Sequence, residues 1–230
     1  MKNCSNSIAK TVIIHDNVII EDGVIIHDYV VLYPGTILKK GVEVFDHCVI
    51  GKMPVASGNL ARSLKSSYGQ TTVGENSILC PGVILYAGIE IGDHVLLGDH
   101  CSIREECKIG SNCIIGRSTN INYATTIGND TKIMDSCIIT GNMTIGNHVF
   151  MGANVITTND NSMGRNGYDE GGIRGPVIHD GARIGAAANI LPSIVVGENA
   201  VVGAGSVVTK HVAAGALVMG VPAKEVSKSN

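Results

Sequence analysis

The sequence predicts an all-β fold, a parallel β-helix of about nine triangular coils, from three observations. Apolar residues recur every six positions in three long blocks, and such internal self-similarity is typical of a solenoid. Gly often follows the apolar residue, with Asp or Asn next, as in Ile91-Gly92-Asp93, which is the composition of tight turns. The 230 residues include 6 Tyr, 2 Phe and no Trp, so β-branched residues must fill the interior.

The blocks define the elements in order. One short strand and one turn occupy every six residues from Ile14 to Ile50, from Val73 to Thr157 and from Ile178 to Val208. A period of six fits neither an amphipathic helix nor an alternating strand. Three units close one coil of about 18 residues, and coils stack as parallel strands about 4.8 Å apart. We expect a single domain over 1–230, with a closing segment at about 212–230.

Two insertions interrupt the repeat, at about 51–72 and 158–176. Long irregular segments that leave a regular scaffold are usually functional or disordered. The second insertion is the stronger functional candidate, because the three-unit phase of the repeat continues across it. The first insertion could equally be a plain surface loop.

Composition excludes several classes of function. The net charge of −3 does not favour a nucleic-acid or anionic-membrane surface, and no apolar run is long enough for a membrane span. The N-terminal Met1–Asn6 segment lacks a secretory signal. Seven Cys without framework spacing indicate a reducing, cytoplasmic environment. Cys101, Cys107 and Cys113 occupy equivalent positions in successive repeats and are predicted to be core residues.

Residues 18 positions apart stack at one corner, so the turns sort into three columns. The column that contains Gly92-Asp93-His94 has ordinary turn chemistry and is predicted to be structural. A second column replaces the Gly with polar residues, which suits a polar ligand such as a sugar, or a solvated ridge. Its turns are Arg104-Glu105-Glu106, Asn122-Tyr123-Ala124, Thr140-Gly141-Asn142 and Thr158-Asn159-Asp160.

The third column changes from charged to small residues toward the C-terminus. It begins with Asp99-His100 and Arg117-Ser118, where Asp99, Arg117 and Asp135 could also form a surface salt ladder. Small residues leave a groove and free backbone N–H groups, which suits a long thin ligand. The small residues are Gly152, Ala153, Gly185, Ala186, Gly203 and Ala204.

Beyond its period, the chain resembles the hexapeptide-repeat acyltransferases, and this resemblance implies a left-handed helix. Segments 155–165 and 98–105 resemble the subgroup that N-acylates nucleotide-linked amino sugars. Segments 201–210 and 219–224 are similar to the C-terminal signature common to many of these transferases, which supports coenzyme A binding. The Thr158-Asn159-Asp160 motif lacks the Pro-Arg that follows it in some relatives, so the resemblance does not identify the sugar.

The resemblance implies an N-acyltransferase that uses acetyl-CoA or a close acyl-CoA and serves cell-surface glycan synthesis such as that of lipopolysaccharide. It also implies a cytoplasmic homotrimer with active sites between subunits. Alternatives are O-acetylation of a sugar or serine hydroxyl, transfer to a diaminopimelate precursor, and a purely structural β-solenoid.

Roles for individual residues follow from this chemistry. Glu106 and Asp99 are the expected carboxylates nearest the acceptor amine, and His100 is the alternative base. Arg104 or Arg117 would meet a nucleotide phosphate. The other expected substrate-binding residues are Asn122, Tyr123, Asn142, Asn159 and Asp160. The expected cofactor-binding residues are Gly152, Ala153, Gly185, Ala186, Gly203, Ala204, Lys210 and Lys224.

No metal site is expected. His94 and His100 fall on different corners, and His94 and His148 share a corner but lie three coils apart, about 14 Å at strand spacing. This separation is too large for one ion to bind both residues within a subunit.

Overall fold

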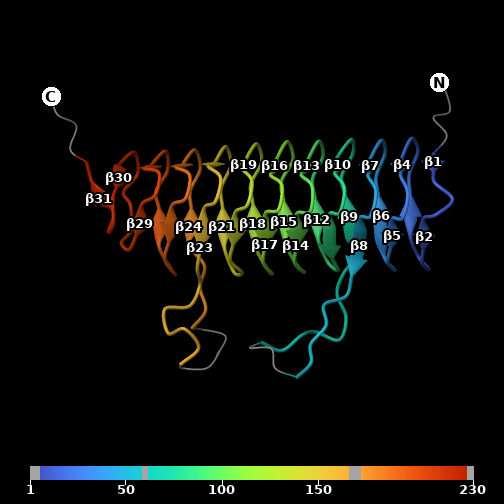
Figure 1. Cartoon of the computed structure of the whole chain (residues 1–230), viewed down its shortest axis with the longest axis horizontal. Coiled ribbons are helices and arrows are strands. Elements are labelled where there is room, and N and C mark those ends of the chain that lie inside the picture. Colours follow the sequence, from blue (N-terminus) through green and yellow to red (C-terminus); the bar gives the residue numbers. More distant parts are fainter. Residues whose placement is uncertain (1–5, 59–61, 166–171, 227–230) are drawn as a thin grey trace.

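The computed structural model describes residues 6–58, 62–165 and 172–226. The Met1–Ser5 segment, in which no secretory signal is expected, and parts of the two insertions (59–61 and 166–171) lie outside the described residues. The predicted all-β fold is confirmed, since the described residues form short strands and no α-helix. None of them therefore forms a helix that could cross a membrane. Figure 1 shows the coils stacked along one axis.

Three sheets, which we number I to III, form the faces of the prism. Sheet I contains β1 (Ser7–Ile8), β4 (Ile25–Ile26), β7 (Glu43–Val44), β10 (Ile78–Leu79), β13 (Leu96–Leu97), β16 (Ile114–Ile115), β19 (Lys132–Ile133), β22 (Phe150–Met151), β25 (Arg183–Ile184), β28 (Val201–Val202), β30 (Leu217–Met219) and β31 (Lys224–Glu225). Sheet II contains β2 (Ile13–Ile14), β5 (Val31–Leu32), β8 (Val49–Lys52), β11 (Ile84–Tyr86), β14 (Ser102–Ile103), β17 (Asn120–Ile121), β20 (Ile138–Ile139), β23 (Ile156–Thr157), β26 (Asn189–Ile190) and β29 (Val207–Val208). Sheet III contains β3 (Ile19–Ile20), β6 (Thr36–Leu38), β9 (Thr71–Val73), β12 (Glu90–Ile91), β15 (Lys108–Ile109), β18 (Thr126–Ile127), β21 (Thr144–Ile145), β24 (Val177–Ile178) and β27 (Val195–Val196).

From β1 to β30, consecutive strands belong to different sheets, so the chain turns a corner after each of these strands. We name the corners edge I–II, edge II–III and edge III–I by the sheets they join. Pairing is parallel throughout, as in the register of Leu97 with Ile115, until β31 pairs antiparallel with β30. The three sheets have 12, 10 and 9 strands, so the number of coils is slightly larger than the predicted value of about nine. The sequence count omitted β1 and β30, which extend the repeat at its two ends.

The core is a column of stacked side chains, mostly aliphatic, to which most strands from β4 to β30 contribute one buried residue. Leu97, Ile103 and Ile115 are 0% exposed, as expected for residues that fill the prism. Cys101, Cys107 and Cys113 are also 0% exposed, which confirms their assignment to the core. The described cysteines are free thiols, and burial raises the pKa of Cys101 to about 12.

The role predicted for the turn glycines requires a correction. The left-handed residue of the turns is not this Gly but the residue two positions later, such as His94 with φ 55° and Asn112 with φ 59°. The Gly is needed because successive coils approach closely there. A Cβ on Gly128 would lie 2.7 Å from the backbone nitrogen of Asn147 in the next coil.

Edge III–I is joined by a ladder of side-chain hydrogen bonds, and this supports its structural assignment. At each step, a turn amide donates to a side-chain oxygen of the next coil at 2.8–3.0 Å. The donors are the amides of Glu75, Asp93, Ser111, Asn129 and Asn147, and the acceptors are the side chains of Asp93, Ser111, Asn129, Asn147 and Asp180.

Candidate functional site

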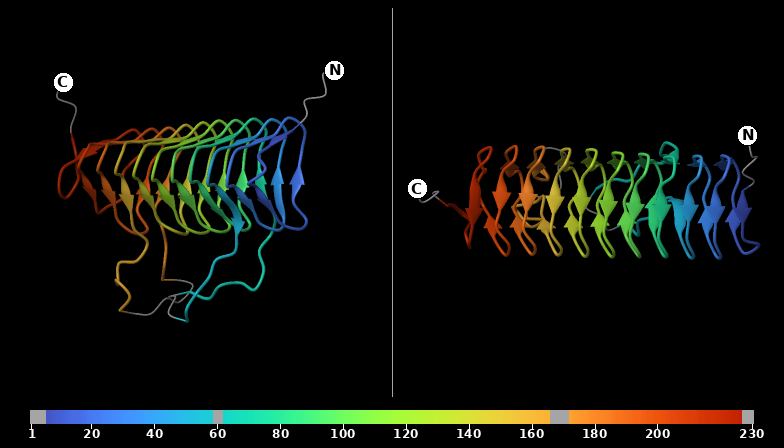
Figure 2. Two further views of the ribbon diagram at one scale, coloured as in Figure 1. Left: turned by 45° about the vertical axis from the view of Figure 1, so that its right-hand side comes forward. Right: turned by 90° about the horizontal axis from the view of Figure 1, so that it is seen from above.

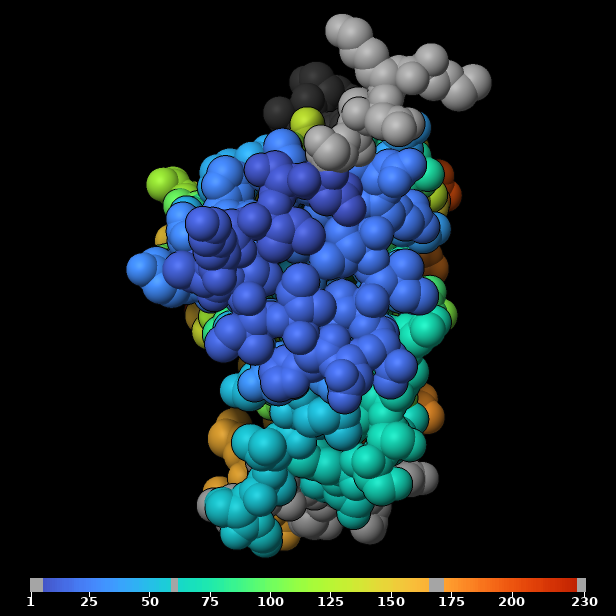
Figure 3. Space-filling model, turned by 90° about the vertical axis from the view of Figure 1, so that its right-hand side faces the viewer, coloured from blue at the N-terminus to red at the C-terminus, as the bar shows by residue number. Residues whose placement is uncertain are grey.

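Both insertions leave the prism at edge II–III. The first loop connects β8 to β9, and the second loop connects β23 to β24. Figures 1 and 2 show the two loops projecting from the same side of the prism, and Figure 3 shows the first loop below the N-terminal end. Four strands of sheet II (β11, β14, β17 and β20) lie between the two loops. This stretch of edge is the candidate active site.

Two ion pairs attach the first loop to edge II–III. Arg62 pairs with Glu105, and Lys65 pairs with Glu106. Glu105 is 0% exposed, whereas the side chain of Glu106 is 36% exposed. Hydrogen bonding to Glu106 raises the pKa of Lys65 above its usual range. The first loop is therefore part of the site and not only a surface connection.

Arginine and tyrosine side chains surround the buried carboxylate. Arg104 donates to Glu105 from Nε at 2.9 Å and from Nη2 at 3.2 Å. The guanidinium of Arg62 lies 3.8 Å from the centroid of the Tyr123 ring. The guanidinium of Arg104 lies 4.9 Å from the centroid of Tyr86. Side chains from the loop and from three successive turns of the edge thus form one cluster.

The second loop is held to the same edge by amide side chains. Asn159 Nδ2 donates to Gly141 O at 3.2 Å, and Asn142 Nδ2 donates to Ile173 O at 3.5 Å. Within the loop, Asp160 accepts from the backbone amides of Ser162 and Gly164 and from the Ser162 hydroxyl at 2.6–2.7 Å. These bonds, first of all that from the Ser162 side chain, lower the pKa of Asp160.

The structure brings together most of the predicted substrate-binding residues. Along edge II–III and its loops lie Arg104, Asn122, Tyr123, Asn142, Asn159 and Asp160, together with Glu106, which was predicted as a catalytic carboxylate. Asp99, His100 and Arg117 instead lie on edge I–II, at the opposite end of β14 and β17. Arg117 there donates to Asp135 at 2.6 Å, so the predicted salt ladder forms at this step.

The predicted small-residue column continues along edge I–II across the second insertion, because Met151 pairs in register with Ile184 and Ile184 pairs with Val202. Close approach of the coils explains its glycines, since a Cβ on Gly152 would lie 2.6 Å from Ala186 N. At the three alanines of this column, Ala153, Ala186 and Ala204, the backbone amide donates to no protein acceptor among the described residues. These amides are the free N–H groups that the prediction requires.

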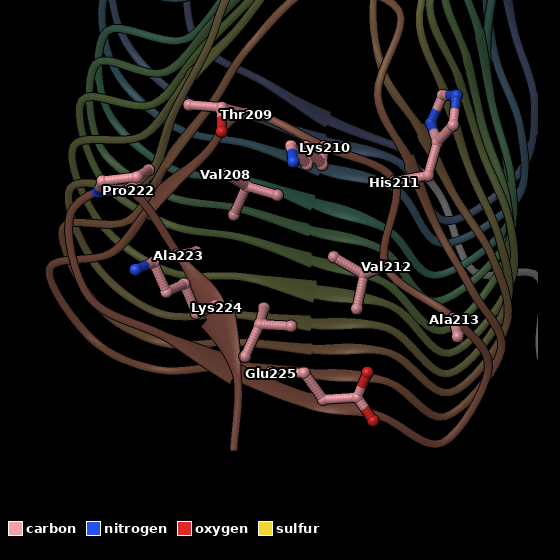
Figure 4. A pocket seen from close by; sticks show the side chains of 11 residues that line it. Val208, Thr209, Lys210, His211, Val212, Ala213, Pro222, Ala223, Lys224 and Glu225 are labelled. Atoms are coloured by element: carbon pink, nitrogen blue, oxygen red, sulfur yellow. The ribbon is translucent and has the colours of Figure 1, made fainter. Parts of the chain in front are cut away.

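The two lysines of the predicted cofactor set lie apart from this column. Lys210 follows β29 at edge II–III, and Lys224 belongs to β31. Both line a hollow of about 280 Å³ at the C-terminal end of the prism, over the core residues Val208 and Val212 (Figure 4). Their assignment to coenzyme A remains a prediction.

Four residues of the cluster were not predicted from the sequence to belong to the site, namely Arg62, Lys65, Tyr86 and Glu105. The ion pairs of Arg62 and Lys65 join residues about 40 positions apart in the sequence, and the period of the repeat does not reveal such contacts. One signal was available: the phase of the repeat places Ile50 and Leu85 in the same column, so both insertions follow a strand of sheet II. In the part of the chain that the structure describes, no three His, Cys, Asp or Glu side chains gather to hold a metal ion.

Comparison with known proteins identifies the repeat. Residues 88–122 and 175–210 match the model of the bacterial transferase hexapeptide (six repeats). A serine acetyltransferase of Buchnera aphidicola subsp. Schizaphis graminum is 41% identical over 86 residues, which cover 35% of this chain and 33% of that protein. The bifunctional protein GlmU of Heliobacterium modesticaldum is 40% identical over 79 residues, 34% of this chain and 16% of that protein. The chain thus spans a third or less of these two relatives.

A solved structure shares the fold over nearly the whole chain. The UDP-N-acetylglucosamine acyltransferase of Arabidopsis superposes with a TM-score of 0.72 and 20% sequence identity, covering 95% of this chain and 73% of that one. The chain thus carries the bacterial transferase hexapeptide repeat over residues 88–122 and 175–210, and it shares its fold with the Arabidopsis acyltransferase.

Proposed function

We propose that the protein is an acyl-CoA-dependent N-acyltransferase that acts on the amino group of a nucleotide-linked amino deoxy sugar in the cytoplasm, for cell-surface glycan synthesis. The observation that carries this proposal is the convergence of both loops and a polar, charged cluster on edge II–III. A purely structural β-solenoid would have three equivalent edges. The name of the Buchnera relative, serine acetyltransferase, supports acyl transfer with acetyl-CoA as the donor.

The reaction needs a held and polarised thioester and an amine free of its extra proton. Backbone N–H groups can supply hydrogen bonds to the donor, and the unpaired amides of Ala153, Ala186 and Ala204 form a row that suits this role. Glu106, at the outer surface of edge II–III, can orient the amine or accept its proton. Glu106 pairs with Lys65, and the amine would have to displace this lysine.

In one chain, the residues proposed to bind the acyl donor lie at edge I–II, and those proposed to bind the acyl acceptor lie at edge II–III. These two edges are on opposite sides of sheet II. A site that uses both sets is completed when edge I–II of one subunit meets edge II–III of another. This arrangement supports a homotrimer with three sites between subunits, in which Asp99 or His100 of one chain approaches Glu106 of its neighbour.

The serine acetyltransferase relative favours O-acetylation of a hydroxyl as the second candidate. A hydroxyl needs a stronger base than an amine, and His100 is the residue expected to supply it. Thiol release from acetyl-CoA, measured against matched nucleotide-linked amino sugars and their hydroxyl counterparts, separates the two functions. Release with amino sugars alone supports the proposal, whereas release with hydroxyl acceptors alone replaces it with O-acetylation. The absence of thiol release with every acceptor refutes acetyl transfer to sugars.

The role of Glu106 has its own test. If it removes the proton, Glu106→Gln should lower turnover at least about tenfold while the fold is kept. Glu90→Gln is the matched control, because Glu90 pairs with Lys108 on the exposed face of sheet III. A Glu106→Gln rate equal to that of the control would exclude proton removal by this residue.

A further inference from the structure

Glu105 is the one charged side chain among the fully buried residues of the described chain. A buried carboxylate is costly unless it is paired and hydrogen-bonded. Glu105 meets this condition with two arginines from different parts of the chain, Arg104 beside it and Arg62 from the first loop. The first loop therefore supplies a charge that the coil cannot provide.

Two guanidinium groups around one carboxylate leave a local excess of positive charge. The side chains of Arg62 and Arg104 are 23% and 27% exposed, so both also reach the surface of edge II–III. Within the described residues, Nη1 of Arg104 has no protein acceptor, because Glu105 engages only Nε and Nη2. Arginines held in this way retain N–H groups for an external anion.

An aromatic ring lies next to each of the two guanidinium groups. Tyr123 lies against Arg62, and Tyr86 lies against Arg104. Lys52 Nζ, 5.4 Å from the Tyr86 ring centroid, adds a third cation beside the arginines. Because the side chains are positioned before a ligand arrives, little conformational entropy remains to be lost on binding.

We propose that Arg62 and Arg104 form a paired-guanidinium subsite for the diphosphate group of a ligand, and that Glu105 is the residue that positions them. Planar guanidinium groups bind phosphate oxygens in bidentate fashion, and two of them match the two phosphates of a diphosphate ester. A nucleotide-linked sugar and coenzyme A both carry such a group. The subsite itself does not depend on the proposed function, and only the choice between these two natural ligands rests on it. Arg117, paired with Asp135 on edge I–II, is not part of the subsite.

The test measures binding without any acyl transfer. Calorimetry with inorganic diphosphate, UDP, dTDP and coenzyme A is compared for the unmodified protein, Arg62→Gln and Arg104→Gln. We expect each substitution to lower the affinity for a diphosphate ligand at least about tenfold. In the double variant, the loss of affinity should be smaller than the product of the two single losses. Lys108→Gln removes a cation from the same coil on sheet III and serves as the control. Loss of nucleoside diphosphate binding identifies the acceptor as the source of the group, and loss of coenzyme A binding identifies the donor.

Two results would overturn the subsite. One is the absence of binding of every diphosphate ligand to the unmodified protein, and the other is unchanged affinity in both arginine variants. Since no amine or thioester is present, a protein that binds diphosphate through these arginines but transfers no acyl group would refute only the proposed function.

Glu105→Gln distinguishes positioning from simple charge attraction. The substitution raises the net positive charge of the cluster by one, so a site that works by charge alone would bind diphosphate more tightly. Positioning by Glu105 predicts the opposite, a loss of affinity of about tenfold, because the guanidinium groups lose their common carboxylate. Circular dichroism of the variant confirms that the coils remain folded, and tighter binding would refute the positioning role.

Discussion

Edge III–I and edge II–III are built from the same six-residue repeat, but they are put to different uses. From Gly74 to Gly146, each turn of edge III–I has a Gly against the next coil and a backbone amide that donates to a side-chain oxygen of that coil. Edge II–III has larger side chains at the position of that Gly, such as Tyr86 and Arg104, together with both loops. The difference shows that one corner of a solenoid can hold the stack together while another is free to carry charge.

The largest expected effect is a loss of stability at edge III–I. A Cβ on Gly128 would lie 2.6–2.7 Å from Asn147 and Gly146 of the next coil. Gly128→Ala should therefore lower the free energy of unfolding by about 1–3 kcal/mol through overpacking. Gly69 of the first loop has no atom within 4 Å of an added Cβ, so Gly69→Ala is the control and should change stability by less than about 0.5 kcal/mol. Urea unfolding measures both, and equal effects would contradict the contrast between the edges.

A smaller loss of stability is expected when the buried carboxylate of edge II–III is replaced. Glu105→Gln leaves Arg62 and Arg104 without a counter-charge, and because both arginines are partly exposed we expect a loss of about 1–2 kcal/mol. Glu90→Gln breaks an exposed pair with Lys108 and should cost under about 0.5 kcal/mol. The readouts are urea unfolding and the rate of proteolysis in the first loop. If the loop of Glu105→Gln were cleaved no faster than in the unmodified protein, its attachment would not depend on this residue.

The smallest effect is a local dependence on pH in the second loop. Because its hydrogen bonds lower the pKa of Asp160 below the ordinary value near 3.8, they stabilise the loop fully above that value. The stabilisation should be lost as the pH falls through the lowered pKa. Amide hydrogen exchange of Ser162 and Gly164, corrected for the intrinsic rate, should show protection decreasing below about pH 4. Asp160→Asn, which cannot ionise, should show no such step, and a step that persisted in it would assign the effect to another group.

The sequence was sufficient for the repeating part of the fold because every coil satisfies the same local rule. An apolar residue such as Ile103 must point inward and a turn must follow, so the period alone specified strands, coils and parallel stacking. The ends were less predictable. At β31 the chain leaves the repeat and pairs antiparallel, and no further coil enforces the period there.

The candidate site was predicted only in part. The replacement of Gly by Arg104 and Asn122 marked edge II–III correctly as unusual, because a missing small residue is visible in a periodic sequence. The partners of Glu105 and Glu106 were not predictable, since Arg62 and Lys65 lie in a segment without periodicity. Ion pairs of this kind depend on how a loop folds back over the coils, and local sequence carries no record of that path.

Because neighbouring coils are one strand spacing apart, the distance between the two loop attachments is set by counting. From β8 to β23 there are five steps along sheet II, about 24 Å at the usual spacing. Removing the 18 residues of one intervening coil would bring the loops one step closer without changing the shape of any edge. The length of this surface that is available to a ligand therefore changes only by whole strand spacings, and the number of coils between the two loops determines it.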